Sequence, residues 1–186
     1  NKIHYELAVM NGSGINRKDN NNQKDVIAKL EYRMKPNLRM VVSGQLGKGH
    51  ALASSPYCPD IQVGEDYTRD RWSAGAEWKH HTEGVDYWKN RTAQIQAEVL
   101  GGRDGRNHSI GAYATACLPV CGAVDLIASA DYMNYNTDLG LKQMNTVFGI
   151  QHWFYKTCRL QVQYTHANPA KGKHFGYLQT QVQVAF

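Results

Sequence analysis

Charged residues recur at alternate positions in many segments of this chain, and their spacing suggests electrostatic selection of ions rather than covalent catalysis. Rings of charged side chains around a pore determine which ions pass through it. A second interpretation is that opposite charges pair with one another and hold a polar wall together, and the mixed signs favour this one. Arginines 33, 39, 71 and 159 would add a mild preference for anions. The basic candidates for the pore lining are Lys29, Arg33, Arg39, Arg71, Lys79 and Arg159, and the acidic residues of the same face are Glu6, Glu31, Glu77, Glu98, Asp125 and Asp131.

Cysteine and histidine are the other residue types with chemical potential. Cys117 and Cys121 are expected to face each other across a short turn. Two states are therefore possible: a disulfide between them in an oxidising compartment, or a pair of free thiols. The eight histidines include no pair with the spacing of a zinc site. We accordingly expect no metal site and no cofactor.

A catalytic site at the rim of a barrel is the main alternative chemistry. Outer-membrane proteases and phospholipases place acids, histidines or serines where loops meet strands. Nothing in the sequence fixes the geometry of the residues that could meet there. These residues are Asp104, His108, Asp138 and His166.

Strict alternation of apolar and polar residues indicates that β-strands position these side chains. The segments are 5–9, 28–33, 39–43, 71–79, 92–99, 110–116, 124–132, 144–155, 159–165 and 178–186. They predict about ten strands of about ten residues, a length that crosses a membrane when the strand is tilted. Strands of soluble proteins average about five or six residues. The chain is therefore predicted to be all-β, a transmembrane antiparallel meander barrel.

The connections between these segments are expected to alternate between long loops and short turns. Long loops are predicted at residues 11–24, 47–68, 101–107, 136–141 and 166–174, and short turns at 35–37, 81–84, 118–120 and 156–158. In outer-membrane barrels the turns are periplasmic and the loops face outward. An even number of strands then places both termini in the periplasm.

Composition is compatible with this class and excludes others. The chain has 186 residues and a net charge of +5, and its mean hydropathy is −0.56. No apolar stretch approaches the length of a transmembrane helix, whereas alternating strands keep average hydropathy low. Lysine and arginine are scattered among acidic residues, so no nucleic-acid partner is expected.

The closing segment carries a terminal motif. Residues 176–186 alternate and end in an aromatic residue, Phe186, with Val182 and Val184 on the same face. Such an ending looks like the signal by which barrels are recognised for insertion, because an edge strand can add to the sheet of an assembly machine. We therefore expect the barrel assembly machinery and outer-membrane lipids as partners.

The layout also resembles the C-terminal half of the phosphate-selective porin O and P family. Residues 26–32 followed by Pro36, together with 42–44, 71–78, 93–98 and the closing strand, carry the resemblance. It implies a homotrimer of barrels of about sixteen strands. The family's constricting loop lies in the N-terminal half, for which this chain has no room, so its anion-binding residues are not carried over.

The sequence thus predicts one transmembrane domain over residues 1–186, the C-terminal portion of a longer porin in the bacterial outer membrane. Its expected function is passive diffusion of small hydrophilic solutes, with anions or phosphate preferred, and no enzymatic activity. The alternative is a narrow ten-stranded barrel, which would leave little lumen and act as a rim enzyme or a structural or assembly component.

Overall fold

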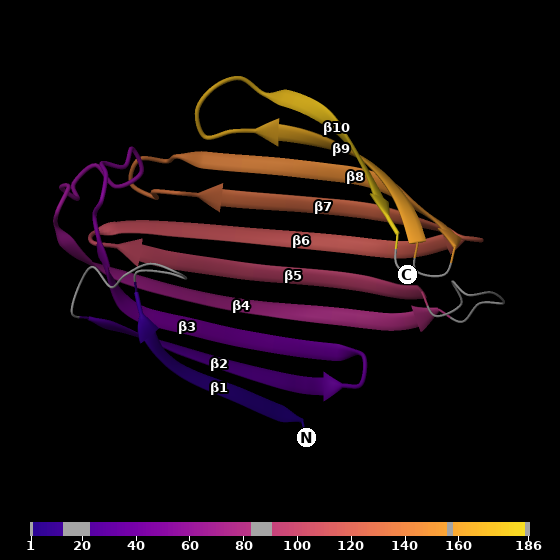
Figure 1. Ribbon diagram of the computed structural model, residues 1–186, viewed down its shortest axis with the longest axis horizontal. Helices are drawn as coiled ribbons and strands as arrows, with labels where there is room; N and C mark the ends of the chain where they lie inside the picture. Colours follow the sequence, from indigo (N-terminus) through magenta and orange to yellow (C-terminus); the bar gives the residue numbers. More distant parts are fainter. Residues whose placement is uncertain (1, 13–22, 83–90, 156–157, 185–186) are drawn as a thin grey trace.

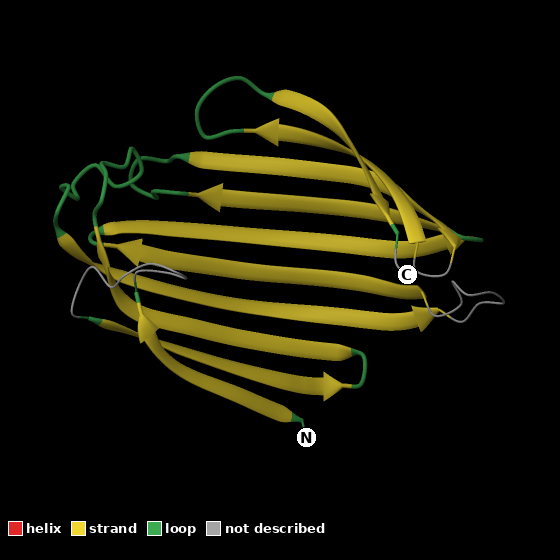
Figure 2. Ribbon diagram, in the orientation of Figure 1, coloured by secondary structure: helices red, strands yellow, loops and turns green. Residues whose placement is uncertain are grey.

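The computed structural model describes residues 2–12, 23–82, 91–155 and 158–184, and the side chains of residues 81 and 82 are not described. Ten strands in these residues form one sheet (Figures 1 and 2). The strands are β1 (Ile3–Asn11), β2 (Lys24–Lys35), β3 (Leu38–His50), β4 (Asp66–Thr82), β5 (Arg91–Asp104), β6 (Asn107–Cys121), β7 (Val124–Asn134), β8 (Lys142–Tyr155), β9 (Cys158–Asn168) and β10 (Phe175–Gln183).

The strand order is a simple meander in which each strand pairs with the next one along the chain. Every one of the nine pairings is antiparallel. The predicted all-β antiparallel meander is therefore confirmed. The described residues contain no helix long and apolar enough to cross a membrane.

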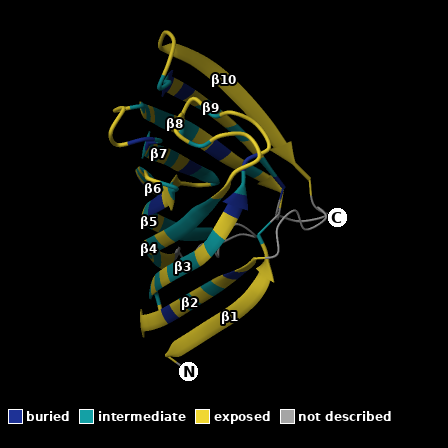
Figure 3. Ribbon diagram, turned by 90° about the vertical axis from the view of Figure 1, so that its left-hand side faces the viewer, coloured by how far each residue is buried: buried dark blue, intermediate teal, exposed yellow. Residues whose placement is uncertain are grey.

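The sheet is curved and has two edge strands, β1 and β10. Both edges bend toward the same side of the sheet (Figure 3). Within the described residues β1 pairs with β2 and β10 with β9, and no backbone pairing joins the two edges. The sheet described is thus a curved wall, and the closed barrel expected from the sequence is not part of it.

The two faces of the sheet have opposite chemistry, and their burial is the reverse of that in a soluble protein. Large apolar side chains of one face lie open, for example Leu7 at 72%, Leu46 at 66% and Phe148 at 65% exposure. Polar side chains of the other face are buried, with Asp125 at 3% and Gln151 at 2%. No second layer of described residues covers this polar face. The side chains bury one another, as expected on the concave side of a curved sheet.

The turn between β6 and β7 lies further along the chain than the sequence suggested. It consists of Gly122 and Ala123, and Gly122 has a positive φ of 44° that favours glycine there. The predicted turn at residues 118–120 is wrong, because that segment still pairs with β7 through Leu118 and Pro119. The predicted turn at 35–37 is confirmed, since residues 36 and 37 join β2 to β3.

The opposite end of the sheet carries the longer connections, with one exception. Residues 51–65 join β3 to β4, a shorter loop than the predicted 47–68. The connection between β5 and β6 is only Gly105 and Arg106, so the predicted loop at 101–107 is wrong. Gly105 has a φ of 61°, which suits a tight turn. Both strands therefore continue further than alternation alone predicted.

Both chain ends lie at the turn end of the sheet (Figure 1). At the start of β1, Ile3 pairs with Tyr32 near the β2–β3 turn. At the end of β10, Gln183 pairs with Arg159 near the β8–β9 connection. The described loops β3–β4, β7–β8 and β9–β10 lie at the other end.

Candidate functional site

A ladder of ion pairs crosses the polar face near its turn end. Glu31 lies between two arginines that are directly opposite each other in the β2–β3 register, Arg33 and Arg39. Its carboxylate accepts from Arg33 Nε at 3.0 Å and from Arg39 Nη1 at 3.2 Å. Arg39 Nη2 also binds Glu77 on β4 at 2.7 Å. One carboxylate thus separates two like charges, and Arg39 links three strands.

The ladder continues toward the centre of the sheet. The other oxygen of Glu77 binds Lys79 Nζ at 2.8 Å and accepts from Gln94 Nε2 at 2.9 Å. Further along β5, the Tyr113 hydroxyl donates to Glu98 at 2.8 Å and accepts from Gln96 at 2.6 Å. The contacts of Arg39, Gln94 and Tyr113 join neighbouring strands, so side-chain contacts link each strand to the next from β2 to β6.

A second network is centred on Asp125 of β7. Arg91 on β5 reaches across β6 and binds Asp125 Oδ1 at 2.6 Å. Asp125 Oδ2 accepts from Gln151 Nε2 at 2.9 Å and from the indole N–H of Trp153 at 2.6 Å. Gln151 Oε1 in turn accepts from Arg159 Nη1 at 2.7 Å. The side chains of Arg91 and Asp125 are only 11% and 4% exposed. Buried charges persist only when paired and hydrogen-bonded, and this cluster meets both conditions.

The loop end of the polar face has its own ion pair. Arg71 Nη2 binds both carboxylate oxygens of Asp104, at 2.8 and 2.7 Å. Near the β1 edge, Lys29 Nζ lies 3.5 Å from Glu6. The polar face is therefore cross-linked at both ends.

The six basic residues predicted to line a pore all lie on this face, and each has a partner. Lys29, Arg33, Arg39, Arg71 and Lys79 bind carboxylates. Arg159 binds the Gln151 amide, and its guanidinium lies 5.6 Å from the centre of the Trp153 ring. These contacts match the interpretation in which opposite charges hold a wall together. Ion selection by these residues stays a prediction.

The predicted rim-enzyme residues are not brought together. Asp104 binds Arg71 on the polar face, whereas His108 pairs in register with Arg103 on the apolar face. His166 stacks on His174, with ring centres 5.9 Å apart. In the described part of the chain, no three His, Cys, Asp or Glu side chains form a group that could hold a metal ion.

Of the two possibilities left open for Cys117 and Cys121, the structure has the free thiols and not the disulfide. Both residues lie on β6 and both thiols are free. Four residues of extended strand span about 13 Å, whereas the Cα atoms of a disulfide lie within about 7 Å. The expectation failed because the turn was placed between the two cysteines, while β6 continues through both.

Residues 51–65 fold against the loop end of β5–β8. Asn136 is 1% exposed, and its Nδ2 donates to the Tyr57 carbonyl and to Asn107 Oδ1, both at 2.8 Å. Its Oδ1 accepts from the backbone N–H groups of Asp138 and Leu139. The Tyr57 and Tyr135 rings lie 4.6 Å apart. One of the four hydrogen bonds of Asn136 therefore anchors residues 51–65, at Tyr57, and the other three hold β6 and the β7–β8 loop around it.

The loop also contains Cys58, whose thiol is partly buried. Burial raises the pKa of this thiol above its ordinary value, and the nearby carboxylates of Asp104 and Asp60 raise the pKa further. The thiolate is the reactive form of cysteine. Cys58 is thus a weaker nucleophile at neutral pH than a solvated thiol.

Of the predicted assembly signal, Val182 and Val184 lie at the exposed end of the chain, at 61% and 53% exposure. Phe186 lies outside the described residues. Their role in assembly stays a prediction.

Sequence reasoning missed several residues that organise this face. Arg91 directly precedes the predicted strand segment 92–99 and was not assigned to it, although it is the partner of Asp125. Gln151 and Asn136 are buried amides that no charge pattern marks. The available signal for Gln151 was its position in the alternation. Its two neighbours, Ile150 and His152, lie on the exposed face, so Gln151 must lie on the opposite, polar face.

No protein-family model, curated protein or solved structure matches this chain.

Proposed function

We propose that this sheet is part of the wall of an outer-membrane porin, through which small hydrophilic solutes diffuse passively. The observation that carries the proposal is the reversed chemistry of the two faces. Leu7, Leu46 and Phe148 are more than 60% exposed, while Asp125 and Gln151 are almost fully buried. An apolar face of this extent needs an apolar environment, and lipid provides one around a barrel.

The topology supports one orientation in the membrane. The two described turns, β2–β3 and β6–β7, share one end of the sheet with the start of β1 and the end of β10. The β3–β4, β7–β8 and β9–β10 loops share the other end (Figure 1). In bacterial outer-membrane barrels the short turns are periplasmic. We therefore place the termini in the periplasm and residues 51–65 on the outer surface.

The open edges support a wall that further strands complete. Edge strands expose unpaired backbone groups, which lipid cannot satisfy. Pairing of β1 and β10 with further strands would remove both edges, as in the barrel of about sixteen strands that the phosphate-selective porin resemblance implies. Val182, Val184 and Phe186 would then form the strand recognised by the assembly machinery, and a homotrimer is part of this proposal.

Selectivity for anions would depend on the basic side chains whose charge is least neutralised by neighbouring carboxylates. Arg159 is the strongest candidate, because among the described residues it contacts an amide and an aromatic ring instead of a carboxylate. Arg33 is the second, since its side chain is 66% exposed beside Glu31. Both would leave a positive potential in the lumen.

The test is solute flux through the native assembly extracted from outer membranes. In planar bilayers we expect stepwise conductance, and in vesicles we expect swelling when small sugars are supplied outside. Arg159→Gln should shift the reversal potential in a salt gradient toward cations. The matched control is Lys173→Gln, which removes an equal charge from the β9–β10 loop. A native assembly that inserts but passes neither ions nor sugars contradicts the porin function.

A second candidate, a wall without an open lumen, is favoured by the extent of charge pairing on the polar face. Five of the six predicted lining cations bind carboxylates. In that case the assembly would insert into vesicles with the same orientation and show no flux. The same experiment therefore separates the two candidates.

A further inference from the structure

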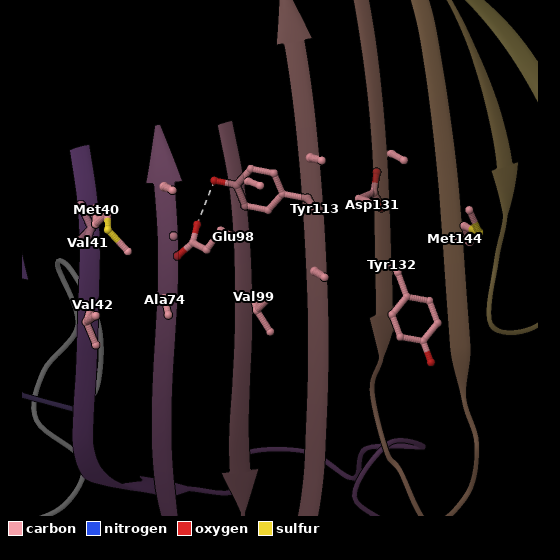
Figure 4. Close-up of a pocket in the computed structure, with 16 residues that line it drawn as sticks. Met40, Val41, Val42, Ala74, Glu98, Val99, Tyr113, Asp131, Tyr132 and Met144 are labelled. Carbon is pink, nitrogen blue, oxygen red and sulfur yellow. Dashed lines mark hydrogen bonds between the residues drawn. The ribbon is translucent and has the colours of Figure 1, made fainter. Parts of the chain in front are cut away.

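The apolar face has a shallow trough across its middle. The trough has a volume of about 590 Å³ and crosses six strands, from β3 to β8. Figure 4 shows Val42, Ala74, Val99 and Tyr132 following one another across the strands. Small side chains make the floor of the trough, and they are Ala74, Ala76, Ala97, Ala112, Ala114 and Ala130.

Larger side chains border the trough on both sides along the strands. Trp72 and Ile110 precede its alanines on the loop side, and Trp78 and Ile95 follow them on the turn side, by the pairing register. Trp72 and Trp78 are six residues apart on β4, about 20 Å along the strand. The trough is therefore a hollow two alanines wide between two apolar ridges.

The trough runs obliquely to the ends of the sheet. At β3 it begins at Met40 and Val42, near the turn end of that strand, whereas at β8 it ends at Met144, the third residue from the loop end. Five strand spacings make it about 24 Å long. With strands tilted by about 45°, it rises about 17 Å along the membrane normal, close to one leaflet of a core of about 30 Å.

Basic groups gather where the trough reaches the loop end. Lys142 is exposed and lies two residues before Met144, on the same face. His166 lies across from Thr146 on β9 and stacks on His174. Lys171 and Lys173 are exposed in the loop between β9 and β10.

A buried acceptor without a partner lies at the same end. Asn134 is directly opposite Lys142 in the β7–β8 register and is 6% exposed. Among the described residues nothing donates a hydrogen bond to its Oδ1. Buried carbonyl oxygens in native proteins almost always accept a hydrogen bond, so a donor from another molecule is expected at this oxygen.

We infer that the trough binds an acyl chain of a phosphorylated glycolipid, with the phosphate held at Lys142 and the two stacked histidines. The inference rests on the membrane placement proposed above, and it adds a specific lipid site to it. The loop end faces outward in that placement, so the lipid belongs to the outer leaflet. A sugar hydroxyl beside the phosphate supplies the donor that Asn134 lacks.

Charge favours this occupant over a second copy of the chain. An apolar trough would also accept an apolar ridge of another barrel. At its open end, however, the β7–β8 loop, the start of β8 and the β9–β10 loop carry three exposed lysines, Lys142, Lys171 and Lys173, against one acid, Asp138. Burying those lysines in a protein interface would leave them without anions, at a large cost in desolvation. A lipid phosphate remains at the water interface and neutralises them.

The experiment is native mass spectrometry of the full native assembly in detergent, with lipid A as the probe and phosphatidylglycerol as competitor. Ala97→Leu combined with Ala114→Leu fills the floor of the trough. It should lower the fraction carrying lipid A about tenfold, the loss expected when roughly two methylene groups lose apolar contact. The matched control, Ala116→Leu, adds the same side chain on β6 outside the trough and should change nothing. Lys142→Gln should lower binding roughly fivefold, and the control Lys29→Gln on the polar face should leave it unchanged.

Insertion into vesicles is measured on the same preparations, so that two kinds of failure are distinct. A wild-type assembly that does not insert overturns the membrane placement and the lipid site together. An assembly that inserts but binds lipid A no better than phosphatidylglycerol, or whose binding ignores the trough variants, overturns the lipid site alone. A change in subunit number in the doubly substituted variant also overturns it, because the trough would then be an interface between copies.

Discussion

The network around Asp125 gives the sharpest prediction about stability, through the substitution Asp125→Asn. The change keeps the size of the side chain but removes its charge. Arg91, only 11% exposed, would then have no carboxylate partner in the network. The new amide N–H groups would face either Arg91 or both Gln151 and Trp153, because these two share one carboxylate oxygen.

The cost follows from burial. Removing one partner of a buried ion pair destabilises a protein by about 3–5 kcal/mol, because the other charge stays buried and unpaired. The asparagine oxygen can still accept one hydrogen bond, so we expect a loss near the lower limit, about 3 kcal/mol.

The measurement is urea unfolding of the assembly in vesicles, followed by far-ultraviolet circular dichroism and tryptophan fluorescence. Asp131→Asn is the matched control on the same strand and face, since the carboxylate of Asp131 accepts a hydrogen bond from Asn145 at 2.8 Å and pairs with no cation among the described residues. That variant should lose less than about 1.5 kcal/mol. Equal unfolding midpoints and slopes for the two variants would refute the argument that the buried pair dominates this region.

Three further predictions concern the loops. In a cysteine-free background, a membrane-impermeant maleimide should label Asp138→Cys but not Asn37→Cys on intact cells, and the reverse pattern would invert the proposed orientation. Asn136→Ala removes four hydrogen bonds of a buried amide, one of them to the Tyr57 carbonyl, so residues 51–65 should be cleaved by external protease about fivefold to a hundredfold faster, as a loss of roughly 1–3 kcal/mol implies; unchanged cleavage would show that other contacts hold the loop. With the other cysteines replaced, alkylation of Cys58 should still accelerate above pH 9, where an ordinary thiol levels off, because its pKa is raised; a plateau below pH 9 would contradict the burial of this thiol.

The strands were predictable because a single physical rule dominates this sheet. One face is apolar and the other polar, so the polarity of each residue indicates the face on which it lies. In β10, for example, Leu178, Thr180 and Val182 share one face, and Gln179 and Gln181 share the other. All ten predicted segments coincide with observed strands. Their pairing order also follows, since short connections join antiparallel neighbours.

The strand ends were not predictable from alternation, because glycines at the loop end resemble loop residues. Gly101 and Gly102 lie inside β5. A Cβ on Gly101 would lie 2.7 Å from the indole of Trp72, so this glycine makes room for a ring on the neighbouring strand. This glycine is needed for close packing between neighbouring strands. In the sequence it cannot be distinguished from a glycine of a turn.

The polar networks were predictable as a face but not as partners. Parity placed Asp125 and Arg159 on one side of the wall. It could not indicate that Arg91 reaches Asp125 across an intervening strand, or that Arg159 binds an amide. Such choices depend on side-chain reach within a curved sheet, which a one-dimensional pattern does not contain.

The two-residue connection at Gly105 and Arg106 has a consequence for how this chain can diverge. It leaves a notch in the loop rim, and the β3–β4 loop fills it, with Asp60 bound to Asn107 and Ile61 against Gly105. A longer β5–β6 connection would occupy the same space and displace that loop. We therefore expect the lengths of these two loops to vary together among related sequences. A longer β5–β6 connection should occur with a shorter β3–β4 loop.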